Sequence, residues 1–221
     1  SESQMSQMLH PFRGGIKLDS YKEVTRNKTS RSIAVPETLY LPLQQHVGMA
    51  AKACVEEGQL VVADQVIAES PGSVGMRLHA PIAGMIGSIV NFPVIHNSGQ
   101  LASCIELFPD SRIAPVKPCG VVTGSTLENK SVCERIEQAG IVGLGGAGFP
   151  AHIKVREGAG QTVDTLIING VECEPHITCD DRLMQENSAE VIAGAALVAQ
   201  AFNAARCVVA VESDMEAAFS A

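Results

Sequence analysis

The residues of this chain that could do chemistry fall into two stretches, and the first is rich in glycine. Four glycines stand within six residues, and a lysine follows six residues after the last: Gly143, Gly145, Gly146, Gly148 and Lys154. Glycine lets the backbone approach a ligand closely, and successive bare N–H groups form a concave site for an anion. The stretch therefore predicts a loop that could cradle a phosphate group.

The second stretch places polar groups at the end of an apolar run. The run 166–168 predicts a strand, and Asn169, Glu172 and Glu174 follow it directly. In open α/β sheets, ligands bind outside the carboxyl ends of the strands, where such groups can reach them. We expect the two stretches to form one nucleotide site.

Three of the glycines also match the dinucleotide-binding pattern G-x-G-x-x-G, with Glu172 near the distance expected of a ribose-binding acid. The elements around the pattern do not fit that fold. A strand should lead directly into the glycines, but a helix is predicted there, and Pro150 follows too soon for a long helix. The ordinary dinucleotide fold is therefore less favoured. A further alternative is that the glycines serve only a tight turn.

A metal site is a second alternative, because Cys173, His176 and Cys179 have ligand chemistry at close spacing. A structural zinc normally needs four ligands, and no second pair stands nearby. Iron–sulfur runs use cysteine where His176 stands. We predict no metal here, and we expect Cys173 to be a small residue in a nucleotide-binding turn.

Three other histidines lack a second ligand close in sequence and are expected to be hydrogen-bonded or on the surface: His46, His79 and His96.

The second half of the chain alternates predicted helices and strands. Ser125 and Glu128 form a capping-box pattern that opens a helix through about residue 139, with Gly140 as its stop. About two turns of helix fit between Pro150 and the glycines at 158 and 160. A strand at 165–169, a buried, Ala-rich helix at about 188–202 and a strand at 206–211 follow. A parallel sheet with so few strands is incomplete, so we expect a fragment of a longer protein.

The first half consists of short apolar runs separated by turn residues, which predicts a small all-β unit. The runs that we expect to form strands are 39–41, 53–55, 60–62, 65–68, 76–79, 85–86 and 88–90. Their order resembles the barrel-sandwich fold of biotinyl and lipoyl carrier domains. Those domains carry a modifiable lysine in a hairpin, but the hairpin at 70–75 has none, so a swinging-arm role is excluded.

The expected organisation is mixed, α+β with an α/β part. Residues 1–32 form an extended lead-in, either a solvated tail or a segment wrapped along a neighbouring domain. Residues 33–110 form the barrel-sandwich unit, 111–124 a proline-containing linker, and 125–221 a partial α/β domain.

Composition limits the function classes. The 221 residues are 46% hydrophobic with a formal net charge of −8, so a packed core is expected and nucleic acid is not the main partner. No apolar run is long enough to span a bilayer, and the N-terminus lacks the pattern of a signal peptide. Seven cysteines without regular spacing then indicate a reducing compartment.

The motifs together resemble the C subunit of the Rnf ion-translocating electron-transport complex, and more distantly the FMN- and NADH-binding subunit of respiratory complex I. The similarity lies in the glycine loop, the Asn-x-x-Glu-x-Glu-Pro stretch and the following Asp-Asp-Arg-Leu-Met. The first half agrees, through Pro-Leu-Gln-Gln-His-Val-Gly at 42–48 and His-Ala-Pro-Ile-Ala-Gly at 79–84. The match covers nearly the whole chain, and the Gln-Gln-His segment favours Rnf over a cobalamin-reductase relative.

The resemblance implies a non-covalent FMN reduced by NADH. Carried over by position, the four glycines would cradle the phosphate side of the flavin, with Lys154 near the flavin or its phosphate. Asn169 and Glu172 would contact the flavin, and Phe149 and Glu174 would help to receive NADH. No side chain needs to act as a catalytic acid or base, because the flavin supplies the chemistry.

Three residues depart from the complex I pattern. Leu144 stands where arginine is found, Val171 replaces an acid that contacts flavin, and Ala151 stands where threonine is usual. The family's two cubane iron–sulfur clusters need cysteine runs that these residues lack, so the clusters are expected in a missing C-terminal part and the fragment alone to be inactive.

The implied function is electron entry, from NADH through FMN to iron–sulfur clusters. The subunit would lie peripherally on the cytoplasmic face of the bacterial inner membrane, against the membrane subunits of the complex. The alternatives are a cobalamin-reductase-like flavoprotein and a non-catalytic assembly or docking subunit.

Overall fold

A computed structural model describes residues 18–72, 74–95, 99–113, 129–146, 148–158 and 161–221, with the side chains of 129–131 left out. The chain divides into two compact units. We call Ser1–Ser30, Asn169–Ser188 and Ala210–Ala221 the turn unit, and Arg31–Ile168 with Ala189–Val209 the barrel–helix unit. Each unit is described by itself.

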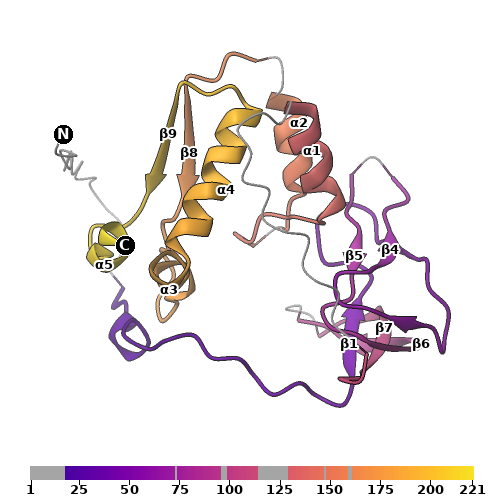
Figure 1. Cartoon of the computed structure of the whole chain (residues 1–221). Helices are drawn as coiled ribbons and strands as arrows, with labels where there is room; N and C mark the ends of the chain where they lie inside the picture. Colours follow the sequence, from indigo (N-terminus) through magenta and orange to yellow (C-terminus); the bar gives the residue numbers. More distant parts are fainter. Residues whose placement is uncertain (1–17, 73, 96–98, 114–128, 147, 159–160) are drawn as a thin grey trace. The chain divides into compact units, whose positions relative to one another are not determined.

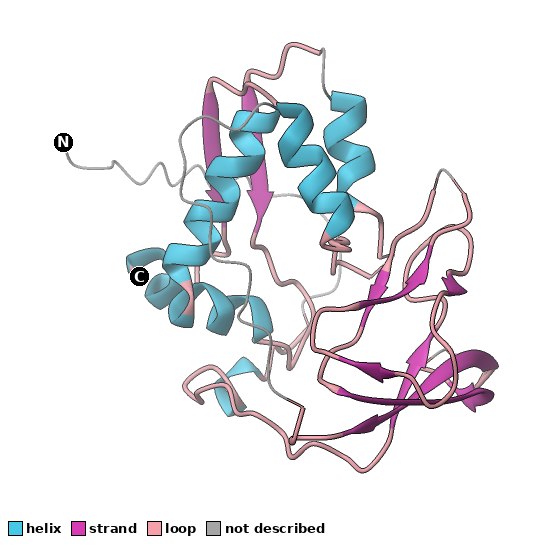
Figure 2. Ribbon diagram, turned by 45° about the vertical axis from the view of Figure 1, so that its right-hand side comes forward, coloured by secondary structure: helices cyan, strands magenta, loops and turns pink. Residues whose placement is uncertain are grey.

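The barrel–helix unit begins with two antiparallel sheets, drawn in magenta in Figure 2. The first has the order β1-β7-β6-β3 and the second β2-β4-β5. Ile67, Ala68, Ile105 and Leu107 are fully buried and form the centre of the core. The strands are β1 (Leu39–Pro42), β2 (Lys52–Ala53), β3 (Leu60–Val61), β4 (Val66–Glu69), β5 (Leu78–His79), β6 (Gly84–Pro93) and β7 (Leu101–Pro109).

The hairpin of β6 and β7 differs most from the sequence-based expectation. The two runs predicted at 85–86 and 88–90 form one strand, β6, whose pairing with β7 shifts register between Ile86 and Ile89. Gly87 lies in this irregular stretch, where an added Cβ would come within 2.7 Å of the Phe108 ring. Strand β7 was not predicted, although buried Ile105 and Leu107 alternate there with Glu106.

His46 is buried and hydrogen-bonded, as predicted. Its Nε2 accepts the Met76 backbone N–H at 3.1 Å, so Nδ1 carries the proton and donates to the Val47 carbonyl at 3.0 Å. His96 lies outside the described residues.

Two short helices follow, α1 (Asn129–Gln138) and α2 (Ala151–Gly158). Val132, Val155 and Ala201 form a second buried cluster between them and the end of α4 (Ser188–Ala201). Gly140 ends α1 as predicted, with φ at +68°. The Gly140 N–H donates to the Glu137 carbonyl and the Ile141 N–H to the Ile136 carbonyl, the bonding of a Schellman cap. The capping box at 125–128 lies outside the described residues.

Strands β8 (Thr165–Asn169) and β9 (Arg206–Ala210) pair as a two-stranded sheet. The arrows run in the same direction in Figure 1, and Arg206 bonds to Asp164 at one end while Gly170 bonds to Ala210 at the other, so the pair is parallel. The prediction that α4 is buried is correct only in part. Ala195 and Ala201 are buried, but Ile192 is 59% exposed, since the two strands present too little surface to cover the whole helix.

The turn unit contains helices that the sequence did not predict: the 3-10 helix η1 (Lys22–Val24), α3 (Cys179–Glu186) and α5 (Glu216–Ser220). Backbone bonds tie η1 to the turn before α3, since the His176 N–H donates to the Ser20 carbonyl at 2.7 Å. The described part of the N-terminal lead-in therefore packs within this unit.

Candidate functional site

The glycine loop is closed at its base and open at its tip. The Gly143 N–H donates to the Phe149 carbonyl at 2.8 Å, and Val142 pairs with Pro150 in an isolated β-bridge. An added Cβ at Gly145 or Gly146 would meet no atom within 4 Å. The tip therefore offers bare backbone with open space in front of it, as a phosphate cradle requires.

Gly148 has a different role from Gly145 and Gly146. Its φ is +60°, and an added Cβ would lie 2.9 Å from the Gln45 carbonyl oxygen and 3.0 Å from the Cα of His46. The Val47 N–H donates to the Gly148 carbonyl at 3.3 Å. Gly148 thus allows the loop to approach the barrel segment at 45–47, which is a packing role.

Lys154 is exposed on α2 and reaches back over the loop. Its Nζ lies 5.6 Å from the centroid of the Phe149 ring and 3.9 Å from the place where a Cβ on Gly143 would be. The ring attracts the ammonium group, which helps to hold it near the loop. The structure therefore places Phe149 and the ammonium group of Lys154 beside the glycine loop.

The acidic stretch lies in the turn unit, and Glu172 is its buried member. Glu172 is 2% exposed, and its Oε1 accepts hydrogen bonds from the Asp180 N–H and the Cys179 thiol, each at 3.0 Å. This carboxylate therefore caps the N-terminus of α3 from seven residues away. Its other oxygen, Oε2, is buried with no hydrogen-bond partner among the described residues.

Asn169 and Glu174 are more accessible. Both side chains are exposed, and Asn169 Oδ1 accepts the Val171 N–H at 3.2 Å, which shapes the turn after β8. Burial raises the pKa of the Asp180 carboxyl group, and the negative charges of Glu172 and Glu174 raise it further. The end of β8 is thus a crowded acidic site.

The ionisation of Glu172 reflects opposing effects. Burial would raise the pKa of its carboxyl group, but hydrogen bonds from the Asp180 N–H and the Cys179 thiol outweigh this effect, together with the nearby Asp181 N–H and the charge of Lys22. The net result is a lowered pKa, so Glu172 is a carboxylate near neutral pH. The bond to Glu172, with burial, raises the pKa of Cys179, which therefore remains a thiol.

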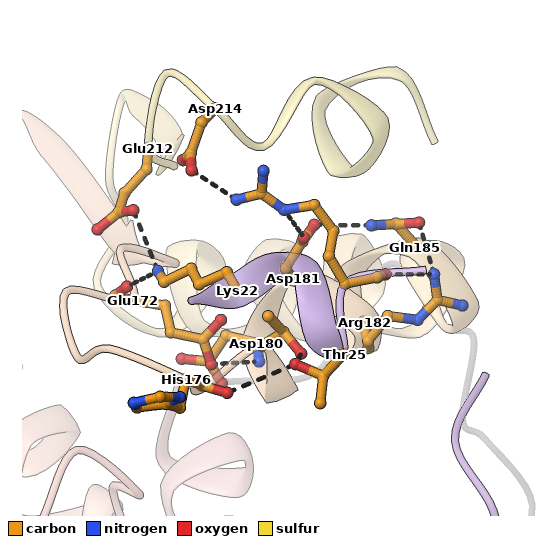
Figure 3. Close-up of polar contacts among 12 residues, drawn as sticks. Lys22, Thr25, Glu172, His176, Asp180, Asp181, Arg182, Gln185, Glu212 and Asp214 are labelled. Atoms are coloured by element: carbon orange, nitrogen blue, oxygen red, sulfur yellow. Dashed lines mark hydrogen bonds and ion pairs between the residues drawn. The ribbon is translucent and has the colours of Figure 1, made fainter. Parts of the chain in front are cut away.

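Lys22 lies in this region although no motif pointed to it (Figure 3). Lys22 is 3% exposed, and its Nζ donates to the backbone carbonyl of Glu172 and to Glu212 Oε2, the latter at 3.2 Å. Its position 150 residues from Glu172 explains why no local pattern could reveal the contact.

Other residues hold the same segment in place. Arg26 lies 2.5 Å from Asp214 and 3.6 Å from Asp181, and the Tyr21 ring stacks on His176 with centroids 4.8 Å apart. Further bonds join Thr25 to Thr178, Arg182 to the Arg26 carbonyl, and the Ser30 N–H to Glu186. Residues 20–30 are therefore built into the turn unit.

The alternative metal site is not assembled as the sequence pattern suggested. Among the described residues, the ligand atoms that come within 4.8 Å of one another belong to Glu172, Cys179 and Asp180, without Cys173 or His176. His176 is stacked on Tyr21 instead, and the Cys179 thiol donates a hydrogen bond to Glu172. The arrangement is explained as a hydrogen-bonded helix cap.

Two family models match the chain. Residues 10–112 match the RnfC barrel sandwich hybrid domain, and residues 136–221 match the Nuo51 FMN-binding domain. These matches define a class of protein in which a barrel-sandwich domain is joined to an FMN-binding domain of the complex I type.

The curated relatives that match the chain are C subunits of ion-translocating oxidoreductase complexes, which confirms the resemblance to the Rnf C subunit. The chain is 34% identical over 219 residues to the C subunit of the ion-translocating oxidoreductase complex of Rhodobacter capsulatus, and 36% over 213 residues to that of Haemophilus influenzae. It is 34% identical over 217 residues to the C subunit of the proton-translocating ferredoxin:NAD(+) oxidoreductase complex of Clostridium ljungdahlii. These alignments cover 96–97% of this chain but 42%, 26% and 47% of the relatives.

In the described ranges, none of the helices combines the length and the hydropathy needed to cross a bilayer.

Proposed function

We propose that this chain is the flavin-binding, electron-entry part of an ion-translocating oxidoreductase subunit, in which NADH reduces FMN. One observation supports this most strongly: the matched FMN-binding unit contains an open glycine loop with a lysine ammonium group held beside it. When bound, FMN accepts a hydride from NADH and releases electrons singly. The residues fit such a group, because Gly145 and Gly146 leave room for it.

The chain's own groups would bind and orient the cofactor. The amides around Gly145 and Gly146 would bind the flavin phosphate, Gly143 would close the base of the loop behind them, and Lys154 would neutralise the charge of the phosphate. Gly148 would contribute by fixing the loop on the barrel segment. Phe149 lies beside Lys154, where its ring could stack on NADH.

The turn after β8 would contribute acceptors. Asn169 and the unpartnered Oε2 of Glu172 would receive hydrogen bonds from the flavin, and an acceptor buried without a donor is costly enough to make such a bond favourable. The exposed Glu174 carboxylate would bind hydroxyl groups of NADH. That both stretches bind the same flavin is part of the proposal.

We propose the partners and the location from the resemblance to the Rnf complex. Electrons would pass to iron–sulfur clusters in the remainder of the protein, and the subunit would dock on membrane subunits at the cytoplasmic face. The name of the Clostridium ljungdahlii relative couples ferredoxin to NAD(+), so the same site could exchange electrons with NAD in either direction, as the potentials require.

The test is a titration of the full-length subunit with FMN, followed by flavin fluorescence, with NADH oxidation assayed in parallel. Gly145→Leu fills the space at the loop tip without backbone strain, because the position has no atom within 4 Å of an added Cβ and no positive φ. We expect FMN affinity to fall at least about tenfold, and NADH oxidation with it, because the leucine side chain would occupy the space through which the phosphate reaches the loop amides.

Gly194→Leu is the matched control, because an added Cβ there also meets nothing within 4 Å and the position lies on α4, outside the loop. It should leave FMN affinity unchanged. Lack of FMN binding by the unaltered subunit would reject the cofactor assignment. Normal FMN binding by Gly145→Leu would reject the loop as the FMN site. If Gly145→Leu instead lost assembly with the other subunits but kept NADH oxidation, the docking alternative would be favoured.

A further inference from the structure

Lys22 is a buried charge that the proposed electron entry does not yet use. Its side chain is 4% exposed, while that of its ion partner Glu212 is 26% exposed, and 3.2 Å separates the two groups. A lysine is rarely buried unless it is paired and hydrogen-bonded, because desolvating the ammonium group is costly. The burial of Lys22 therefore calls for an explanation at the place where its ammonium group lies.

That place is the backbone of Glu172. The ammonium group donates to the Glu172 carbonyl, while the carboxylate of the same residue is held by the Asp180 N–H and the Cys179 thiol. Glu172 is thus fixed at its main chain by η1 and at its side chain by α3. Its Oε2 has no partner among the described residues, so the fixed residue retains one buried, unused acceptor.

We propose that Lys22 is a positioning residue for the flavin site, which holds Glu172 in place and keeps it ionised so that Oε2 can accept a hydrogen bond from the cofactor. This inference rests on the proposed function. It assigns part of the site to the N-terminal segment, far in sequence from both motifs.

The charged and titratable groups around Glu172 can be named for each element that packs on it. Cys179 and Asp180 belong to α3, Lys22 to η1, and Glu212 follows β9. Lys22 supplies the positive charge, and Glu212 partly neutralises it. Removing the charge of Lys22 should therefore disfavour the Glu172 carboxylate, and removing that of Glu212 should favour it.

The experiment compares FMN affinity against pH in the full-length subunit and its variants. Lys22→Met keeps the length of the side chain and removes the charge, and Lys28→Met is the matched control, an exposed lysine on the same segment. We expect Lys22→Met to weaken FMN binding by about tenfold or more. It should also raise the pH at which affinity is lost on acidification, whereas Lys28→Met should change neither quantity.

A second variant separates positioning from general destabilisation. Glu212→Gln should move the acid midpoint of FMN binding in the opposite direction, to lower pH, because the Lys22 charge is then less neutralised. Lys22→Arg keeps the charge and should retain a midpoint close to that of the unaltered protein even if its affinity falls. These two variants also decide the question if Lys22→Met fails to fold.

The outcomes are distinct. If the unaltered subunit binds no FMN, the proposed function fails and this inference fails with it. If the unaltered subunit binds FMN and Lys22→Met binds it equally well, only the role of Lys22 is overturned. A loss of affinity with no shift of midpoint in either Lys22→Met or Glu212→Gln would show a structural role alone and would also overturn the inference.

Discussion

At the scale of single residues, the two stretches that we propose to bind the flavin offer different chemistry. The glycine loop contributes bare amides and the Lys154 ammonium group, which suit an anion. The turn after β8 contributes an amide side chain and carboxylates, of which only Glu172 is buried. A phosphorylated flavin needs both kinds of group, because one end is anionic and its ring system carries polar groups.

The contribution of Lys154 can be isolated by changing the ligand rather than only the protein. Lys154→Met should weaken FMN binding several-fold, because the exposed ammonium group no longer faces the phosphate, and should leave binding of riboflavin, which lacks the phosphate, unchanged. Fluorescence titrations with both ligands measure this, with the exposed Lys52→Met as control. An equal loss for both ligands would contradict a phosphate contact.

Glu186 gives a pH-dependent prediction for stability. Its hydrogen bond from Arg182, with that from Ser30, lowers its pKa from 4.5 to about 2. A depressed carboxyl pKa stabilises the folded state fully above about 4.5, and this contribution is lost as the pH falls towards 2. Glu186→Gln should therefore lower the melting temperature slightly at pH 7 and have no effect near pH 2. A difference that stays constant over this range would contradict the assignment.

At the scale of elements, glycine conformations fix where helices stop and where segments meet. Gly140 ends α1 in a left-handed conformation, and an added Cβ there would lie 2.9 Å from the Arg77 carbonyl oxygen and 3.0 Å from the His79 ring. Gly140→Ala should lower the free energy of unfolding by about 1–2 kcal/mol, because alanine is strained at this positive φ even before the close contacts are counted. Chemical denaturation measures this, and Gly194→Ala, in helix α4, should be neutral or stabilising. Equal stabilities for the two variants would contradict the cap.

The elements also show what the sequence could and could not predict. The stop at Gly140, the two-turn helix after Pro150 and strands β8 and β9 depend on local patterns, and all were predicted. Helix α3 was missed although Thr178 at its N-cap and Asp181 three residues later were a usable local signal. The hydrogen bond that caps it comes instead from Glu172, a contact through space. Strand β7 was missed although Ile105, Glu106 and Leu107 alternate, which was a usable signal.

The same distinction applies to the site. The glycine loop and the acidic turn are contiguous motifs, so their residue types and spacing indicate a nucleotide site. Lys22 is defined only by folding, which brings it to Glu172 across 150 residues. The different roles of Gly145 and Gly148 also depend on the structure, since only the folded chain shows which one faces open space.

At the scale of the whole molecule, the chain consists of two compact units, and the N-terminal segment belongs to one of them. Deletion of residues 1–30 from the full-length subunit should accelerate hydrogen exchange in 172–188 and 210–221, because these stretches lose the bonds of Lys22, Arg26 and Ser30. Peptides from β1 and β2 are the internal control and should exchange as before. Unchanged exchange in the turn unit would contradict a structural role of the segment.

The central claim is that the open glycine loop and the acidic turn both bind one FMN. An experimental structure of the full-length subunit with FMN tests it most directly. We predict the flavin phosphate against the amides of Gly145 and Gly146 and the ammonium group of Lys154, with the ring system within hydrogen-bond distance of Asn169 and Glu172. A flavin bound elsewhere, or one that contacts only one of the two stretches, would contradict the account.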